Sequence, residues 1–179
     1  MPDFNKVLTP GNTDAGEVTT VIEIPKWSTL KVEWNREVAA FELDRVEPSI
    51  FAKPVNYGFI PQTLDEDGDE LDTLVLTNDP IQTGVFLTAK IIGLLRFEDD
   101  GEVDDKIICV PADDRNTDNA ITSLDDLHEQ FRKKLEHHFT HYKDLKKPGS
   151  TVIKGWGDAA EAAQVIRECI ERYNNSRAA

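Results

Sequence analysis

Apolar and polar positions along this chain change their period near residue 124. Before that point, apolar residues occur in short runs or alternate with polar ones, and the alternation is clearest from Leu30 to Trp34. Such runs, bounded by Gly, Pro, Asn and Asp, are typical of β-strands. The pattern predicts strands over residues 18–24, 30–34, 38–43, 55–60, 73–77, 85–97 and 106–110.

After residue 124, apolar residues recur every three or four positions, which indicates amphipathic helices. The apolar face of the first helix comprises Leu124, Leu127, Phe131, Leu135, Phe139 and Tyr142. That of the terminal helix comprises Ala159, Ala163, Ile166, Ile170 and Tyr173. Ser123 with Asp126, and Asp158 with Glu161, resemble capping boxes. Residues 151–156 form a short predicted strand between the two helices.

Many short strands followed by two helices predict a mainly β protein with flanking helices, in the α+β class. We expect a small closed antiparallel OB-like barrel with two C-terminal helices packed outside it. No repeat or low-complexity linker divides the chain, so residues 1–179 are predicted to form one domain. Within it, residues 1–17 are predicted to be an arm and residues 174–179 a frayed tail.

Charge excludes one class of partner. The chain has 34 acidic and 20 basic residues and a formal net charge of −14, with no basic run, so a nucleic-acid partner is not expected. No apolar stretch is long enough to span a membrane, and no signal peptide is evident. Cys109 and Cys169 match no metal-binding spacing, which favours reduced thiols and a cytoplasmic location.

The densest acidic run is Asp65-Glu-Asp-Gly-Asp-Glu-Leu-Asp72. In an extended segment Asp67 and Asp69 point to the same side, and Gly68 permits a bend that lets Asp72 rejoin them. A solvated loop or a cluster of hard divalent cations would both relieve the repulsion. An EF-hand loop is excluded, because Glu70 and Leu76 stand where that loop needs Gly and Glu.

A second acidic cluster over residues 98–105 lies between two predicted strands and ends beside Lys106. Charged residues also interrupt the strands themselves, namely Glu23, Lys31, Glu33 and Arg45. Any one of them alone would be expected to face solvent. Together they supply what a phosphate anion and its metals need: basic groups for oxygen atoms and carboxylates for cations.

His137 and His141 are four residues apart on one predicted helix face, a spacing that can chelate a metal. Contact with solvent or with another subunit remains the favoured interpretation of these histidines.

The motif Asp-Gly-Asp-Glu-Leu-Asp72 resembles the signature of the family I soluble inorganic pyrophosphatases. Seven further blocks resemble that family in the same order: Val-Ile-Glu-Ile-Pro25, Leu-Lys-Val-Glu33, Leu-Asp-Arg45, Pro-Val-Asn-Tyr-Gly-Phe-Ile60, Asp104-Asp-Lys106, His-Tyr-Lys-Asp-Leu145 and Gly-Trp156. The similarity spans residues 18–163. It departs from the family at Thr73, where an aliphatic residue is usual, and at Lys53, where related bacterial enzymes often have an aromatic one.

The resemblance implies metal-dependent hydrolysis of inorganic pyrophosphate to two orthophosphates by a metal-activated water, without a covalent intermediate. It implies several Mg²⁺ ions per active site, with Mn²⁺ or Zn²⁺ as substitutes, and a substrate that arrives as its magnesium complex. The implied metal-binding residues are Asp67, Asp72, Asp99, Asp104, Glu23 and Glu33. Asp69 is implied to be the general base or to orient the water. The implied phosphate-binding and catalytic residues are Lys31, Arg45, Lys106, Lys143, Tyr57 and Tyr142.

The chain length resembles that of the compact prokaryotic hexamers, so a homohexamer is expected. Two other classes of protein compete with this interpretation. A nucleic-acid-binding barrel would need a basic groove with exposed aromatic residues. A calcium-binding structural module would explain the acidic loops but not the four basic residues Lys31, Arg45, Lys106 and Lys143.

Overall fold

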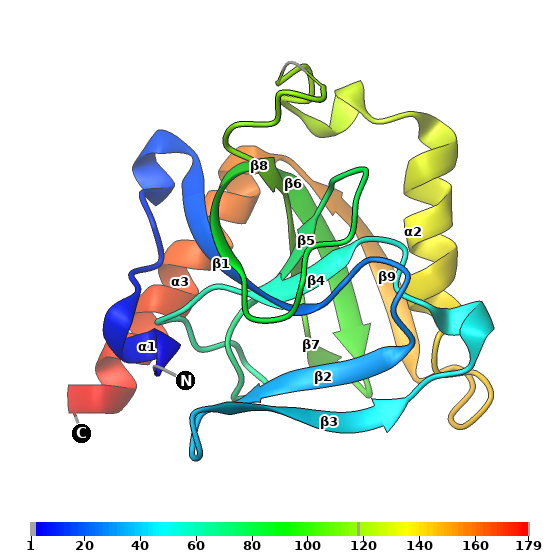
Figure 1. Cartoon of the computed structure of the whole chain (residues 1–179), viewed down its shortest axis with the longest axis horizontal. Coiled ribbons are helices and arrows are strands. Elements are labelled where there is room, and N and C mark those ends of the chain that lie inside the picture. Colours follow the sequence, from blue (N-terminus) through cyan, green and yellow to red (C-terminus); the bar gives the residue numbers. More distant parts are fainter. Residues whose placement is uncertain (1–2, 118, 179) are drawn as a thin grey trace.

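The structure of the protein is a computed structural model, which describes residues 3–117 and 119–178. A seven-stranded sheet is joined by a separate two-stranded hairpin, and the helices lie outside the strands (Figure 1). The strands of the large sheet are β1 (Glu17–Ile24), β4 (Asn56–Phe59), β5 (Asp72–Val75), β6 (Phe86–Asp99), β7 (Glu102–Val103), β8 (Lys106–Pro111) and β9 (Thr151–Gly157). The hairpin consists of β2 (Leu30–Asn35) and β3 (Ala40–Val46). The mainly β class is therefore confirmed.

The strand pairings form a ring. They run from β1 through β4, β5, β8 and β6, and the first half of β6 pairs again with β1. Both β7 and β9 pair with the last part of β6. The wholly antiparallel arrangement that we expected is wrong at one pair, because β5 and β8 run parallel. Parallel neighbours need a long crossover connection, and the long strand β6 with its hairpin β7 supplies it.

One glycine explains how closely two strands of the ring approach. Gly58 lies opposite Ile22 in the antiparallel pair of β4 and β1. A Cβ atom at Gly58 would lie 2.0 Å from the carbonyl oxygen of Val21, so no larger residue fits without moving the main chain. This close contact fixes the position of the neighbouring Tyr57.

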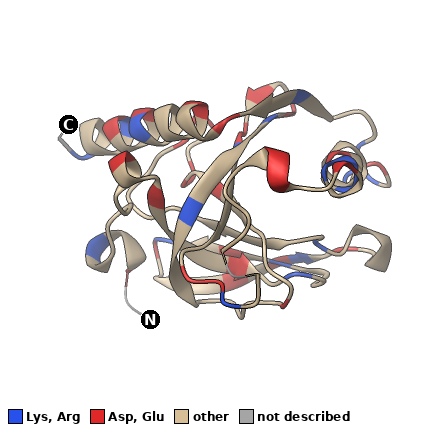
Figure 2. Cartoon of the chain, turned by 90° about the horizontal axis from the view of Figure 1, so that it is seen from above, with Lys and Arg blue, Asp and Glu red and all other residues tan. Residues whose placement is uncertain are grey.

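Two long helices cover different sides of the sheet. They are α2 (Glu129–His141) and α3 (Ala159–Ala178), and Figure 2 shows α3 along one side with α2 seen end-on at another. Ala162, Ile166 and Cys169 of α3 pack into the same core as Val18 and Leu94 of the sheet. On the other side, Leu135 and Phe139 of α2 pack with Leu95 and Phe97 of β6.

The first long helix begins later than predicted, whereas the second begins where expected. The Ser123 capping box is present, but it caps the short 3-10 turn Leu124–Asp126, and α2 begins five residues after Leu124. The Asp158 box does begin α3, since Asp158 and Glu161 exchange backbone and side-chain hydrogen bonds.

At its C-terminal end α3 continues to Ala178 and so includes Asn174, where the sequence predicts that fraying begins. Arg177 stabilises this last turn by stacking on Tyr173 and donating to its hydroxyl group. Residue 179 lies outside the described residues.

The N-terminal segment carries a third, short helix, α1 (Phe4–Val7), which the sequence pattern did not predict. Phe4 is buried against Trp34 and Phe59, and its ring lies 4.7 Å from that of Trp34. Phe4 thus packs α1 against the hairpin, while the 3-10 turn Thr13–Ala15 further along the segment contacts α3 and β1. No helix in the described part of the chain is both long and apolar enough to cross a membrane.

Candidate active site

A cavity of about 230 Å³ lies between the β2–β3 hairpin, the main sheet and the end of α2. All the residues predicted for the site line this cavity except Arg45 and Lys106. They are Glu23, Lys31, Glu33, Tyr57, Asp67, Asp69, Asp72, Asp99, Asp104, Tyr142 and Lys143. Residues separated by up to 120 positions are therefore brought together around one small space.

The parallel pair of strands brings the two acidic clusters together. Asp72 at the start of β5 lies opposite Lys106 at the start of β8. Lys106 is 1% exposed, and its Nζ donates to Asp72 Oδ2 at 2.5 Å and to a carboxylate oxygen of Asp104. Burial lowers the pKa of Lys106, but these two carboxylates outweigh it and raise the pKa above its usual value. Lys106 is therefore a buried cation beneath the cavity.

Asp99 and Asp104 are held on either side of a tight turn. Asp100 and Gly101, between β6 and β7, both have positive φ angles of 55° and 88°, as the turn of a two-residue hairpin requires. Asp99 ends β6, and Asp104 donates its backbone N–H to Phe97 O at 3.0 Å. The turn thus places both carboxylates at the edge of the cavity.

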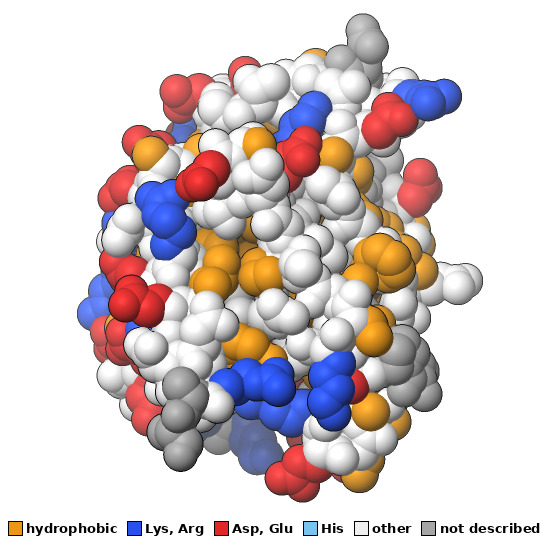
Figure 3. Space-filling model, turned by 90° about the vertical axis from the view of Figure 1, so that its left-hand side faces the viewer, with side chains coloured by type: hydrophobic (Ala, Val, Ile, Leu, Met, Phe, Trp, Pro, Cys, Tyr) orange, Lys and Arg blue, Asp and Glu red, His pale blue; other side chains and the backbone are white. Residues whose placement is uncertain are grey.

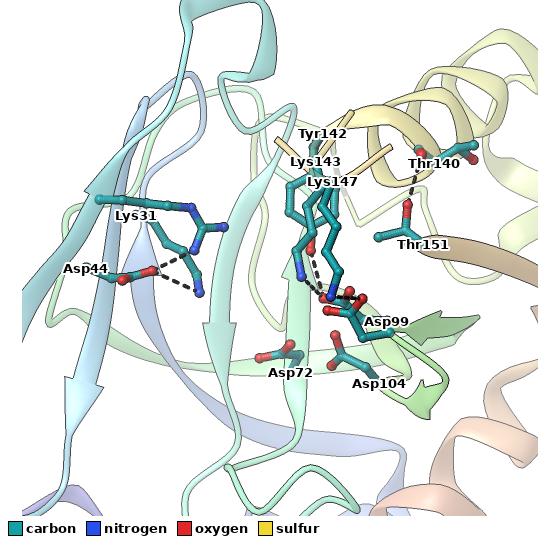
Figure 4. Close-up of polar contacts among 12 residues, drawn as sticks. Lys31, Asp44, Asp72, Asp99, Asp104, Thr140, Tyr142, Lys143, Lys147 and Thr151 are labelled. Carbon is teal, nitrogen blue, oxygen red and sulfur yellow. Dashed lines mark hydrogen bonds and ion pairs between the residues drawn. The ribbon is translucent and has the colours of Figure 1, made fainter. Parts of the chain in front are cut away.

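The end of α2 reaches across to the first of these carboxylates. Tyr142 follows the last residue of α2, and its hydroxyl group donates to Asp99 Oδ2 at 3.3 Å, while the Lys143 ammonium group donates to the same oxygen. Figure 4 shows Tyr142 and Lys143 pointing down to Asp99, with Asp72 and Asp104 below them. Lys31 lies to the left of these residues in the same view, beside Asp44.

The acidic loop before β5 is held by its own backbone and by the hairpin. Asp67 Oδ1 accepts from Asp69 N at 3.0 Å, and Asp65 N donates to Asp69 O at 2.7 Å. Arg36 of the β2–β3 turn donates to Asp69 and to the buried Glu70, at 2.9 and 3.0 Å. Asp67 and Asp69 therefore face the cavity from a loop with a defined shape.

The hairpin supplies the basic groups. Lys31 and Arg45 are register partners in β2 and β3, and both bind the carboxylate of Asp44. Arg45 also binds Glu47, and it lines a neighbouring cavity of about 590 Å³ rather than the first one. The two cavities share Tyr142 and Lys143. The hairpin thus brings Lys31 to the acidic cavity and leaves Arg45 beside it.

The crowded carboxylates of the cavity bind protons more strongly than usual. Burial, and after it the charge of Asp72, raises the pKa of Glu23 well above its ordinary value, although Trp34 N donates to this carboxylate at 2.6 Å. Burial, with nearby Asp72 and Asp69, also raises the pKa of Asp67. Burial raises the pKa of Asp104 to about 7 against the opposing charge of Lys106. A cation entering the cavity would relieve this repulsion.

The two tyrosines remain hydrogen-bond donors. Burial and the adjacent Asp72 raise the pKa of Tyr57, whose hydroxyl group donates to Asp72. Burial and the adjacent Asp99 likewise raise the pKa of Tyr142. Neither phenol loses its proton near neutral pH.

The donor set suits a hard divalent cation such as Mg²⁺, because it consists of carboxylate oxygens. One of these, Asp99 Oδ1, is buried and has no hydrogen-bond partner among the described residues. In residues 3–117 and 119–178, however, no three acidic, histidine or cysteine side chains are already arranged to hold a metal. Lys106, Lys143 and Tyr57 instead donate hydrogen bonds to oxygens of Asp72, Asp99 and Asp104.

Pattern analysis missed three residues that shape the cavity. Glu70 and Lys53 line it, and Arg36 holds Asp69 at its edge. Glu70 belongs to the acidic run of residues 65–72, so its sequence position already placed it near the predicted site. Lys53 stands out in the sequence only as a departure from the family that the motifs resemble, which assigns it no role, and Arg36, in a hairpin turn, carries no signal of this kind.

Comparison with known proteins shows which family this chain resembles. The family model described as inorganic pyrophosphatase matches residues 20–174. The chain is 64% identical to an inorganic pyrophosphatase of Neisseria meningitidis serogroup B, covering 97% of this chain and 98% of the relative. It is 66% identical to the inorganic pyrophosphatase of Haemophilus influenzae, covering 97% of this chain and 99% of that protein.

Solved structures agree with these sequence comparisons. The crystal structure of an inorganic pyrophosphatase from Neisseria gonorrhoeae superposes with a TM-score of 0.95 at 63% identity, covering 96% of this chain and 99% of that one. The enzyme from Thermus thermophilus gives a TM-score of 0.86 at 38% identity, covering 93% and 97% of the two chains.

Proposed function

This chain belongs to the family I soluble inorganic pyrophosphatases, and on that premise we propose how its cavity hydrolyses pyrophosphate to two orthophosphates. The observation that supports the proposal most strongly is the placement of Lys106 between Asp72 and Asp104. At this point a base suited to phosphate oxygens lies within hydrogen-bond distance of two acids suited to cations. Phosphoryl transfer needs positioning and neutralised charge more than covalent help from the protein.

In the proposed mechanism, the carboxylates hold several Mg²⁺ ions, for which Mn²⁺ or Zn²⁺ can substitute. The ligands are Asp67, Asp72, Asp99, Asp104, Glu23 and Glu33. When bound, the metals neutralise phosphate oxygens and lower the pKa of the attacking water. The substrate is pyrophosphate as its magnesium complex.

The remaining residues act on the water and on the substrate. Asp69, on the acidic loop, accepts a proton from the water or orients it toward phosphorus. Lys31, Lys143 and Arg45 hold phosphate oxygens from two sides, and Lys106 does so from below. Tyr57 and Tyr142, which keep their protons, donate hydrogen bonds to the same oxygens. No side chain forms a covalent bond to phosphorus in this scheme.

The test is release of orthophosphate from pyrophosphate by the purified chain, with and without Mg²⁺. Release that depends on Mg²⁺ is the expected result, and a chain that releases no phosphate with Mg²⁺ present contradicts the proposal. The alternatives of a calcium-binding module and of a nucleic-acid-binding barrel both predict no release. On the face shown in Figure 3, acidic and basic side chains are interspersed, and several basic ones gather near the lower edge.

We further propose that the ring of strands is a closed OB-like barrel and that the protein is a cytoplasmic homohexamer. The return pairing of β6 with β1 supports the closed barrel. Support for assembly comes from the exposed apolar side chains of Trp27 and Ile50, which lie with His137 and His141 around one surface cavity. Sedimentation at neutral and mildly acidic pH tests the assembly. Dissociation on protonation of these histidines is expected, and identical profiles at the two pH values contradict that role of the histidines. A single small species at neutral pH contradicts the hexamer.

A further inference from the structure

Lys53 is a buried lysine of the cavity to which the mechanism above gives no task. It is 7% exposed and lines the same cavity as the carboxylates. Its main chain is fixed on both sides, because Lys53 N donates to Ser28 O at 3.0 Å and Lys53 O accepts from Trp27 N at 2.7 Å. The position of the side chain therefore follows from the fold and not from a flexible loop.

The ammonium group of Lys53 lies among three aromatic rings. Nζ is 4.6 Å from the ring centre of Tyr57, 4.9 Å from that of Tyr142 and 5.5 Å from that of Phe139. Aromatic faces stabilise a cation but do not neutralise it. Two of these rings belong to the tyrosines proposed to donate to phosphate oxygens, so Lys53 lies next to the expected position of the substrate.

The charge partners distinguish Lys53 from the other basic residues of the site. Lys31 is paired with Glu33 and Asp44, Lys106 with Asp72 and Asp104, and Lys143 with Asp99. Within the described residues no carboxylate is paired with Lys53, and its Nζ has no hydrogen-bond acceptor. A buried ammonium group without an anion is costly, and an incoming phosphate oxygen would supply the missing partner.

We propose that Lys53 is a further substrate-binding residue, whose ammonium group takes a phosphate oxygen of pyrophosphate or of the product orthophosphate as its counterion. The inference rests on the proposed function of the cavity. It deepens that function by assigning a phosphate contact to the lysine that has no anionic partner in the described chain.

The protonation of Lys53 agrees with this assignment. Burial first, and then the charges of Lys106 and Lys31, lower the pKa of Lys53 to about 7, against the opposing charges of Asp72 and Glu47. The titratable groups that face Lys53 from the surrounding elements are Lys31, Glu47, Tyr57, Asp72, Lys106, His138 and Tyr142. At pH 8 much of Lys53 is neutral in the empty cavity, so an anion that binds it should draw a proton from solution.

The first experiment compares Lys53→Met, Lys53→Arg and the control Lys133→Met, which removes an exposed lysine of α2 that lines neither this cavity nor the one beside His137 and His141. Loss of one charge-assisted hydrogen bond predicts that Lys53→Met raises KM for magnesium pyrophosphate about 10- to 100-fold. Lys53→Arg should restore part of that loss, and Lys133→Met should change nothing. A KM for Lys53→Met within twofold of the wild-type value overturns the proposal.

The second experiment keeps the proposal testable if Lys53→Met does not fold. Calorimetry of inorganic phosphate with Mg²⁺ at pH 8, in two buffers of different ionisation enthalpy, measures proton uptake on binding. The wild-type chain should take up as much as about one proton per site more than Lys53→Arg, because arginine is always charged. Equal uptake by both proteins overturns the proposal. A wild-type chain that hydrolyses no pyrophosphate defeats the proposed function instead.

Discussion

Arg36 Nη2 lies 2.9 Å from Asp69 Oδ1, although 33 residues separate them in the sequence. The Asp69 side chain is 79% exposed, so this ion pair adds less than about 1 kcal/mol to the stability of the fold. What the pair does is hold the β2–β3 turn against the acidic loop. The carboxylate proposed to handle the water is therefore positioned by the element that also carries Lys31.

Replacement of Asp69 should separate folding from turnover. Asp69→Asn removes an exposed charge, so we expect unchanged denaturation curves, together with a turnover lower by about 10²- to 10⁴-fold, the usual contribution of a general base. Asp113→Asn is a matched control, because Asp113 is also exposed and paired with an arginine, Arg115, away from the cavity. Wild-type turnover in Asp69→Asn would remove Asp69 from the mechanism.

Binding of Mg²⁺ should weaken as the pH falls. The pKa of Asp104, at about 7, means that this acid carries more protons at pH 6 than at pH 8. The raised pKa values of Asp67 and Glu23 act in the same direction. A metal must displace those protons, so its apparent affinity decreases on acidification and protons are released on binding. Calorimetric titration with Mg²⁺ at both pH values measures this.

Two controls accompany that titration. Chelation should abolish phosphate release, and added Mg²⁺ should restore it. Asp104→Asn should bind Mg²⁺ more weakly and show a smaller change between pH 8 and pH 6. Equal wild-type affinities at the two pH values would contradict the assignment of these acids as ligands.

His138 should make the fold sensitive to acid. Burial, and then the charges of Lys53 and His137, lower the pKa of His138 to about 3, and its Nε2 has no hydrogen-bond partner in the described chain. The unfolded chain binds this proton near pH 6.5, so the native state loses stability as the pH falls below that value. The loss is about 2 kcal/mol between pH 6.5 and pH 5.

Denaturant titrations at pH 7 and pH 5, followed by tryptophan fluorescence, measure that loss. In His138→Phe the difference between the two pH values should shrink by about the same 2 kcal/mol. The exposed His128, replaced by Asn, serves as the control and should leave the difference as in the wild type. A His138→Phe protein with the wild-type difference would show that His138 is charged in the native state.

Gly58→Ala should destabilise the fold through a clash with the main chain. The added Cβ would lie 2.0 Å from Val21 O, and separating β4 from β1 costs about 2–3 kcal/mol. Gly16→Ala, where the added atom meets open space but φ is 75°, should cost about 1 kcal/mol. Thermal unfolding compares the two variants, and equal losses would contradict the proposed clash. Activity should fall only in Gly58→Ala, because Tyr57 is its neighbour.

Hydrophobic periodicity was sufficient for most of the strands and for both long helices, because each buries one face whose spacing is visible in the sequence. The predicted strand over residues 18–24 and β1 differ by one residue, for example. Periodicity carries no information on which strands pair, and so it missed the parallel pairing of β5 with β8. Short polar motifs located the candidate site, since acids and bases in this order resemble one family.

The two positions at which the sequence departs from that family, Thr73 and Lys53, could be interpreted only with the structure. Thr73 is buried, and its hydroxyl group lies 2.5 Å from that of Thr20, which satisfies both polar groups in the sheet. Lys53 is explained by three rings from two separate elements. Neither set of partners can be found from neighbouring residues, because both depend on contacts between distant segments.

The parallel pairing of Asp72 with Lys106 has a consequence for the order of folding. These residues are 34 positions apart, and β6 and β7 lie between β5 and β8 along the chain. Contacts between such distant segments form late. A growing chain that ends before Lys106 holds both acidic clusters but lacks the ammonium group that joins them. We therefore expect the proposed catalytic cavity to form only after β8 docks and the end of α2 adds Tyr142 and Lys143, so that partly folded chains neither gather the metals nor cleave the substrate.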